Sequence, residues 1–296
     1  MNGPFVAILC AFTFAFSSIL TRRAVIQVPD ATLGVLFSVP TAVVLFSLLL
    51  AFTGDLDSLF RFSWQGYLSL SAAGILQFAL YRSFMYSCVQ LVGANLTSIL
   101  RRFRTLVAVI LGLSILGEPL SWQLLTGVLF IIFGVTIAGM DMRSLVNPGP
   151  IMTGIPKRAL IMAICGGLSG GLSPILIKVG LGSSGSTVAG ALISHTAAAL
   201  ALSLSLLNQR KRANFFSMPG RAVRLFLFVG AFAALANLFR FIALSLSPAS
   251  VASPLISTSP VFLLIFSYIF NRKLELFSKP VILGTITVVI GSILLI

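Results

Sequence analysis

Ten apolar runs, each about 20 residues long, constrain the fold of this chain more than any other feature of its sequence. A helix needs roughly that many apolar residues to cross the hydrocarbon core of a bilayer. Short linkers rich in glycine and proline separate the runs. The sequence therefore predicts ten transmembrane helices, at Pro4–Leu20, Ala31–Phe52, Gln65–Cys88, Ala94–Leu116, Trp122–Met140, Ala159–Val179, Thr187–Leu207, Val223–Leu246, Ala249–Phe270 and Pro280–Ile296.

Composition supports a polytopic membrane protein, because 58% of the 296 residues are hydrophobic and only 9% are charged. The net charge of +14 does not indicate a nucleic-acid partner, since the basic residues are scattered among the linkers. All three cysteines fall inside apolar runs, which favours packing roles over disulfides or metal ligation. The first run lacks the basic flank of a signal peptide and is kept as a span. Without other targeting segments, a plasma or bacterial inner membrane is expected.

The two halves of the sequence resemble each other. Corresponding residues follow the same order at an offset of 155 to 157 positions: Gly34 and Gly190, Leu91 and Leu246, Gly127 and Gly284, Gly134 and Gly291. Each half holds five spans, an odd number, so the second half must lie upside down relative to the first. We therefore expect an all-α membrane protein built from two inverted five-helix repeats, residues 1–145 and 155–296, which is an architecture of secondary transporters.

Two motifs carry a resemblance to a known family. Leu116-Gly-Glu-Pro-Leu120 precedes Gly127 and Gly134 in the first half, and Ser259-Pro-Val-Phe262 with Asn271-Arg-Lys-Leu-Glu275 precedes the matching glycines in the second. With ten spans in two repeats, this pattern resembles the drug/metabolite transporter superfamily, EamA type. The resemblance covers nearly the whole chain and implies a ten-helix transporter. Members move amino acids, sugar phosphates, nucleotide sugars, drugs and other metabolites, so it leaves the substrate open.

Three arginines interrupt the fourth predicted span: Arg101, Arg102 and Arg104. One charged side chain near the bilayer centre costs roughly 3 kcal/mol on insertion scales, and such residues normally face a protein-lined or watery cavity. Arg101 and Arg104 share one helical face. The second half has Ser259-Pro260 where the first has Arg104-Thr105, so the arginines are this chain's own feature. They predict a cavity that binds an anion, although a topogenic or snorkelling role is the alternative.

Further polar residues within spans complete the candidate substrate site. Tyr81 and Arg82 lie in the last third of the third span, Asn237 and Arg240 occupy the equivalent stretch of the eighth, and His195 is in the middle of the seventh. The stretch from Ser253 to Pro260, with Ser257 and Ser259, predicts a bent polar wall in the ninth span. For His195, a satisfied polar position between helices is the competing interpretation. Arg82 and Arg240 could likewise snorkel or bind backbone carbonyls.

The acidic residues limit the possible coupling mechanisms. All six carboxylates stand at predicted helix ends or in linkers, namely Asp30, Asp55, Asp57, Glu118, Asp141 and Glu275. No acid inside a span can therefore neutralise the arginines, bind a cationic drug or relay protons. Exchange of one anion for another fits this pattern better than proton coupling, which His195 leaves open.

The distribution of Lys and Arg predicts the orientation. Linkers after the odd-numbered spans carry most of them, which places those linkers in the cytoplasm and both termini outside. The family resemblance implies the opposite orientation. Both remain expectations.

We expect a secondary active transporter that moves a small anionic or zwitterionic metabolite by alternating access through an arginine-lined cavity. The alternatives are a flippase or carrier for an anionic lipid-linked substrate, and an exporter of amino acids or drugs. An intramembrane enzyme is disfavoured, because the sequence has no paired acids, metal-ligand spacing or nucleophile–base pair. No cofactor, metal or nucleic-acid partner is expected. The expected partners are a small-molecule substrate and the lipid bilayer, for a monomer or homodimer.

Overall fold

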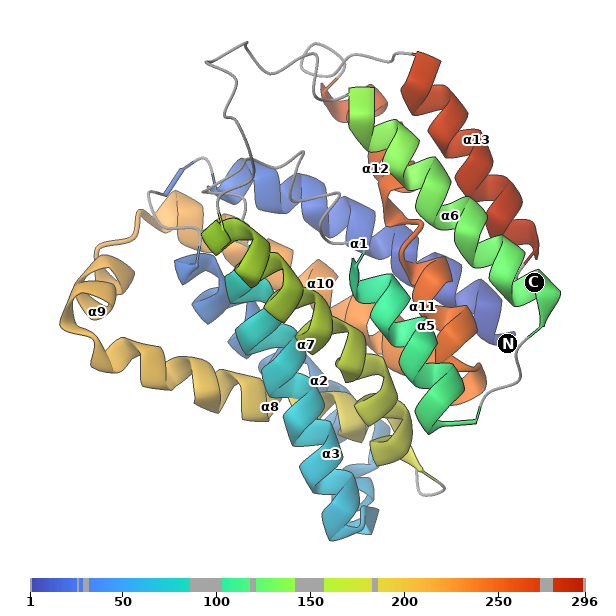
Figure 1. The fold of residues 1–296 in the computed structure, drawn as a ribbon. Helices are drawn as coiled ribbons and strands as arrows, with labels where there is room; N and C mark the ends of the chain where they lie inside the picture. Colours follow the sequence, from blue (N-terminus) through green and yellow to red (C-terminus); the bar gives the residue numbers. More distant parts are fainter. Residues whose placement is uncertain are drawn as a thin grey trace.

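The computed structural model describes residues 2–25, 27–28, 32–85, 103–117, 121–141, 157–182, 186–271 and 279–294. All the regular structure in these ranges is helical (Figure 1). The elements are α1 Gly3–Val25, α2 Leu33–Thr53, η1 Leu56–Arg61, α3 Trp64–Gly74, η2 Ile75–Tyr81, α5 Phe103–Ile115, α6 Trp122–Asp141, α7 Lys157–Leu181, α8 Thr187–Ser203, η3 Leu204–Leu207, α9 Gln209–Phe216, α10 Gly220–Leu246, α11 Ala249–Ile256, α12 Ser259–Asn271 and α13 Lys279–Leu294.

Each of the ten predicted spans coincides with helix in the described chain. Five helices are long and apolar enough on their own to cross a membrane: α1, α2, α7, α8 and α10. The third span is α3 followed without interruption by the π-helix η2. The ninth span, for which the sequence predicts a bend, is broken at Ser257 and Thr258 into α11 and α12. Pro254 lies inside α11, and Pro260 is the second residue of α12. The sixth, α7, continues through Pro174 as one helix.

Two short helices in the linkers were not predicted. The 3₁₀ helix η1 joins the second span to the third, and the α-helix α9 joins the seventh to the eighth. They occupy equivalent places in the two halves. The Asn208 side chain caps α9 by accepting hydrogen bonds from the backbone N–H groups of Arg210 and Lys211. Short polar linkers carry too little periodicity for sequence patterns to reveal such helices.

The packing of helices repeats between the halves. α1 lies along α10 just as α7 lies along α3, and α5 contacts α7 just as α12 contacts α1. The pairs α2 with α8, α5 with α11, and α6 with α13 each join equivalent spans of the two halves. If each helix is replaced by its equivalent in the other half, the same helix contacts result. The two halves are therefore related by a pseudo-twofold axis.

Close contacts between helices confirm the correspondence residue by residue. A Cβ added to Gly74 would lie 1.9 Å from the backbone oxygen of Ser194, and one on Gly230 would lie 2.9 Å from that of Ser38. Ser194 stands 156 positions after Ser38, and Gly230 stands 156 after Gly74. The two contacts are therefore the same contact made once by each repeat.

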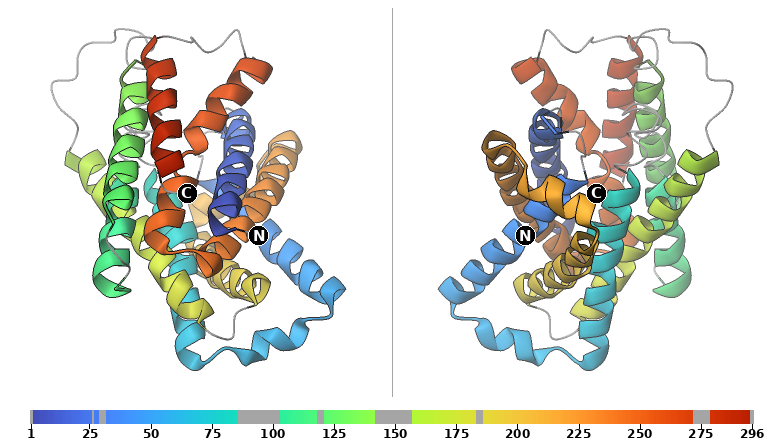
Figure 2. Two further views of the ribbon diagram at one scale, coloured as in Figure 1. Left: turned by 90° about the vertical axis from the view of Figure 1, so that its right-hand side faces the viewer. Right: turned by 90° about the vertical axis from the view of Figure 1, so that its left-hand side faces the viewer.

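The equivalent helices α6 and α13 show that the repeats are inverted. They lie side by side on one flank of the bundle (Figure 2). Gly291, near the end of α13, packs against the backbone of Gly127, near the start of α6, where an added Cβ would be 2.7 Å from its oxygen. Because the end of one helix meets the start of its counterpart, the two run antiparallel. The sequence expectation of inverted five-helix repeats is confirmed.

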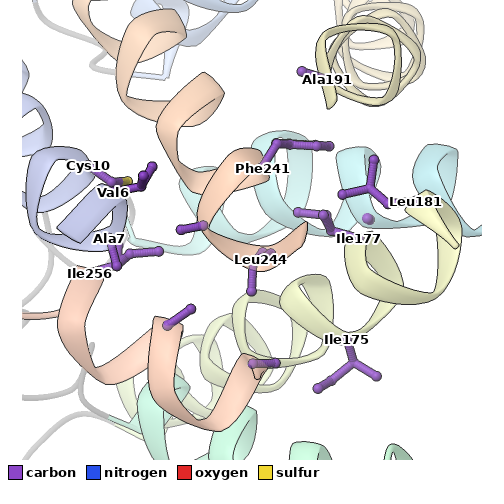
Figure 3. Packing of buried hydrophobic residues seen from close by; sticks show 14 of the residues in the cluster. Val6, Ala7, Cys10, Ile175, Ile177, Leu181, Ala191, Phe241, Leu244 and Ile256 are labelled. Carbon is purple, nitrogen blue, oxygen red and sulfur yellow. The ribbon is translucent and has the colours of Figure 1, made fainter. Parts of the chain in front are cut away.

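The main hydrophobic core lies around α10. Phe241 and Leu244 of this helix are buried between Val6 and Cys10 of α1 and Ile177 of α7 (Figure 3). This packing fixes α10 against both repeats. It also carries the two buried polar residues of α10, described next, into the protein interior.

Candidate functional site

Arg240 and Asn237 lie buried on α10, each only 1% exposed. The Asn237 amide donates through Nδ2 to the backbone oxygen of Ala233, at 2.7 Å, whereas its Oδ1 has no hydrogen-bond partner in the described chain. All three side-chain nitrogens of Arg240 are likewise without a partner among the described residues. A buried charged side chain normally has a hydrogen-bond or ion-pair partner, because burying an unpaired charge costs free energy. The two residues are one helical turn apart and so lie on neighbouring surface of the same helix.

Arg104 of α5 lies over an aromatic ring. Its guanidinium carbon is 5.0 Å from the ring centre of Tyr81, within the range of a cation–π interaction. Gly170 of α7 leaves the room for this pair, since an added Cβ would come within 2.6 Å of the tyrosine ring and 2.9 Å of Arg104 Cδ. The glycine-rich stretch of α7 therefore serves close packing and brings α5 and η2 together.

Arg82 follows the π-helix η2 directly. Its Nη1 donates to the Ser38 hydroxyl of α2 at 3.1 Å, and its guanidinium carbon is 5.7 Å from the ring centre of Phe78. A π-helix holds one more residue per turn than an α-helix, and such insertions occur frequently at functional sites. Here it places Gln77 in the interior, where the Oε1 atom has no hydrogen-bond partner in the described part of the chain.

These side chains form one electrostatic cluster. Arg240 lies within electrostatic range of Arg104 and Tyr81, and His195 lies within range of Arg82 and Arg240. Of the acidic residues that the structure describes, Asp55 and Asp57 lie in the linker that contains η1, and Asp141 is the last residue of α6. Asp30, Glu118 and Glu275 lie outside the described residues. The cluster is therefore rich in positive charge, and it can attract and hold an anion.

His195 of α8 occupies a satisfied position. Its Nδ1 is 2.8 Å from the backbone oxygen of Ala191, to which it donates. The ring stacks on Phe78 at 4.0 Å and contacts Phe46 at 5.1 Å. These contacts give the imidazole a packing role between α2, η2 and α8.

The break in the ninth span exposes fewer polar groups than its sequence suggests. Ser257 is half-buried and its hydroxyl donates to the backbone oxygen of Ser253 at 2.8 Å, while Ser259 is half-buried at the start of α12. The buried Ser253 hydroxyl is the group without a described partner. Arg101 and Arg102 lie outside the described residues.

Sequence patterns alone did not identify Ser38, Gln77, Phe78 or Gly170 as parts of this cluster. One signal was available for Ser38, because Ser194 stands at the repeat offset from it. Phe78 precedes Arg82 by four residues, so their contact is local to one helical stretch. Gly170 approaches Arg104 only through the crossing of α7 with α5.

Comparison with known proteins agrees with this architecture. The sequence model of the EamA-like transporter family matches residues 1–140 and again residues 157–296. No curated relative matches the chain. Among solved structures, 28 chains match. One of them, titled only "Crystal structure of protein", superposes with a TM-score of 0.72 over 99% of this chain and 94% of its own, at 16% sequence identity. That similarity concerns the fold alone.

Proposed function

Because this chain belongs to the EamA-like transporter family, we propose that it is a secondary active transporter of a small anionic or zwitterionic metabolite. Its place is a plasma membrane or bacterial inner membrane. The substrate's anionic group binds between Arg240, Arg104 and Arg82, with Asn237 and Tyr81 as neighbouring polar contacts. Arg101, Ser257 and Ser259 complete the proposed site, and His195 supports it through its stacking on Phe78.

The buried guanidinium of Arg240, which has no hydrogen-bond partner among the described residues, is the observation that carries this proposal. A permanently charged side chain buried among apolar helices is destabilising unless an anion pairs with it for part of its working cycle. Carboxylate and phosphate groups match the planar fork of arginine, and two arginines can share one such group. The substrate is therefore the natural counter-charge in a cluster that no carboxylate within a span neutralises.

The inverted repeats supply the proposed mechanism. In folds of this class, the substrate site lies between the repeats, and one repeat rocks against the other to open it to each side in turn. The cluster has this position, since it draws Arg82 and Arg104 from the first repeat and Arg240 and His195 from the second. Without an acid to relay protons, exchange of one anion for another is the proposed coupling.

Counterflow in proteoliposomes tests the proposal. Vesicles preloaded with phosphates, carboxylates or amino acids would be assayed for uptake of the same labelled compound. We expect an anion to show counterflow that falls at least about tenfold in Arg240→Gln, in Arg104→Gln and in the double variant Arg101→Gln/Arg104→Gln, because a hydrogen bond to a charged group contributes about 1.5–3 kcal/mol.

Arg61→Gln is the matched control, since Arg61 is exposed on η1. It should transport like the wild type. Counterflow of a neutral or cationic compound that survives in the cluster variants would reject the anion site and assign those arginines to topology.

A further inference from the structure

A second concentration of positive charge lies on the surface of the described chain. Helix α9 and the first two turns of α10 carry five basic side chains, all exposed: Arg210, Lys211, Arg212, Arg221 and Arg224. We call these residues the α9 basic surface. No acidic residue occurs between Asp141 and Glu275 in the sequence, so this stretch provides no counter-charge of its own.

The position of these charges on their helices adds to the positive field. α9 and α10 have no acidic residue in their first turns, and the basic residues lie near their N-terminal ends. The N-terminus of a helix carries a partial positive charge that favours anions and disfavours cations. Two helix N-termini with five added cations therefore form a surface whose favourable partner is anionic.

The equivalent linker of the first repeat has a short helix in the same place but a different charge. η1 occupies the same place in the first repeat, but its surroundings carry Asp55 and Asp57 beside the single basic residue Arg61. Five spans lie between the two linkers, so they face opposite sides of the membrane. Each side of the membrane thus has one short linker helix, and of the two only α9 is strongly basic.

Apolar contacts hold α9 against the helix bundle. Phe215 stacks on Phe37 of α2 at 4.5 Å and so fixes α9 against the bundle. Beside it, Leu207 is 79% exposed and Phe216 is 77% exposed. A basic helix with exposed apolar side chains, next to spans, is typical of segments that lie in the headgroup region.

We propose that the α9 basic surface binds the headgroups of anionic phospholipids. Charge complementarity and continuity with the spans both favour this occupant, because the headgroups of the same bilayer are the anions present at highest local concentration. The proposal does not depend on the substrate or on transport.

Thermal unfolding of the purified, delipidated full-length protein in nonionic detergent tests it. Phosphatidylglycerol and phosphatidylcholine would be titrated separately into the wild type and into Arg210→Gln/Arg212→Gln/Arg221→Gln/Arg224→Gln. We expect phosphatidylglycerol to raise the unfolding temperature of the wild type more than phosphatidylcholine does. In the variant the half-saturating concentration should rise by at least about tenfold. Added salt should weaken the effect in the wild type.

Two further variants make the result decisive. The same four positions changed to lysine should keep the response to phosphatidylglycerol, and Arg61→Gln on η1 should also keep it. The lysine variant tests the charge even if the glutamine variant folds poorly. An equal response to both lipids, an unchanged response in the glutamine variant, or full replacement of the lipid effect by inorganic phosphate would overturn the proposal.

Discussion

At the scale of single residues, buried polarity is distributed unevenly. His195 has a backbone acceptor and aromatic neighbours, whereas Arg240 has none of its nitrogens paired among the described residues. Both side chains are 1% exposed, so burial does not distinguish them. Their hydrogen-bond partners do distinguish them. On this basis we assign His195 to the stability of the fold and Arg240 to substrate binding.

Replacing Arg240 by methionine should separate stability from transport. Methionine is the residue found at the equivalent position of the first repeat, Met85. We expect the free energy of unfolding to stay the same or rise by about 1–4 kcal/mol, since an unpaired buried charge is removed. Counterflow should be lost. Thermal unfolding and counterflow on one preparation measure both, and retained counterflow would remove Arg240 from the site.

Replacing His195 by phenylalanine should have the opposite profile. The aromatic contacts with Phe46 and Phe78 can be kept, while the hydrogen bond to Ala191 is lost. We expect a loss of about 1 kcal/mol in unfolding free energy and counterflow within a few-fold of the wild type. Abolished transport in a normally stable protein would instead place His195 in contact with substrate.

At the scale of elements, η2 explains an irregularity in the repeat. The offset between halves is 156 at Gly74 and Gly230 but 155 at Leu91 and Leu246. The π-helix Ile75–Tyr81 lies between the first members of these pairs and absorbs the one extra residue of the first repeat. Beyond it, the offset pairs Arg82 with Asn237.

Deleting one residue from η2 should therefore be tolerated. Leu80 is partly exposed, and its removal allows an uninterrupted α-helix like α10, with the flanking residues kept in register. The matched control deletes Leu235 from α10, which is exposed to a similar degree. Because α10 has no extra residue, that deletion rotates Asn237 and Arg240 by about 100°. We expect cooperative thermal unfolding for the first variant only; failure of both would show that η2 is not an insertion.

Gly170→Ala tests how tightly α7 packs on Tyr81 and Arg104. A Cβ at this position would lie 2.6 Å from the tyrosine ring, so we expect a loss of about 1–3 kcal/mol in unfolding free energy and weaker counterflow. Gly220→Ala is the control, because nothing lies within 4 Å of the added Cβ. It should change stability by no more than about 0.5 kcal/mol. Equal effects of the two substitutions would argue against a close crossing at Gly170.

At the scale of the whole molecule, a symmetric scaffold carries an asymmetric site. The offsets pair Arg82 with Asn237, Arg240 with Met85, and Arg104 with Ser259. Each arginine thus has an uncharged counterpart, although the helices that carry them are equivalent. The two linker helices η1 and α9 likewise occupy equivalent places but carry different charges.

Labelling from the two sides of the membrane tests the inversion. In a background without Cys10, Cys88 and Cys165, the exposed positions Phe60 on η1 and Asn214 on α9 would be changed singly to cysteine. The charge distribution predicts that Phe60→Cys reacts with an impermeant maleimide in intact cells, and that Asn214→Cys reacts only after permeabilisation. The reverse result would show the opposite orientation. Reaction of both in intact cells would contradict the inverted repeat itself.

Sequence patterns were sufficient to predict the class of the fold. The length of the apolar runs predicted every span, because the bilayer sets that length. An odd number of spans per repeat then required inversion. The prolines of the ninth span predicted a bend there, and the structure has a break between α11 and α12. Pro260, which has no N–H to donate, lies in the first turn of α12.

Which polar residues contact one another, and which of them have hydrogen-bond partners, follows from how the helices pack in three dimensions. Whether Arg104 lies over Tyr81, or Arg82 reaches Ser38, depends on helix crossings, and those are set by side chains from other spans. The same holds for His195, whose hydrogen bond is local but whose stacking partner Phe78 comes from another repeat. Apolar periodicity along one helix contains no information about its neighbours, so the pairing of charges appears only once the helices are packed together.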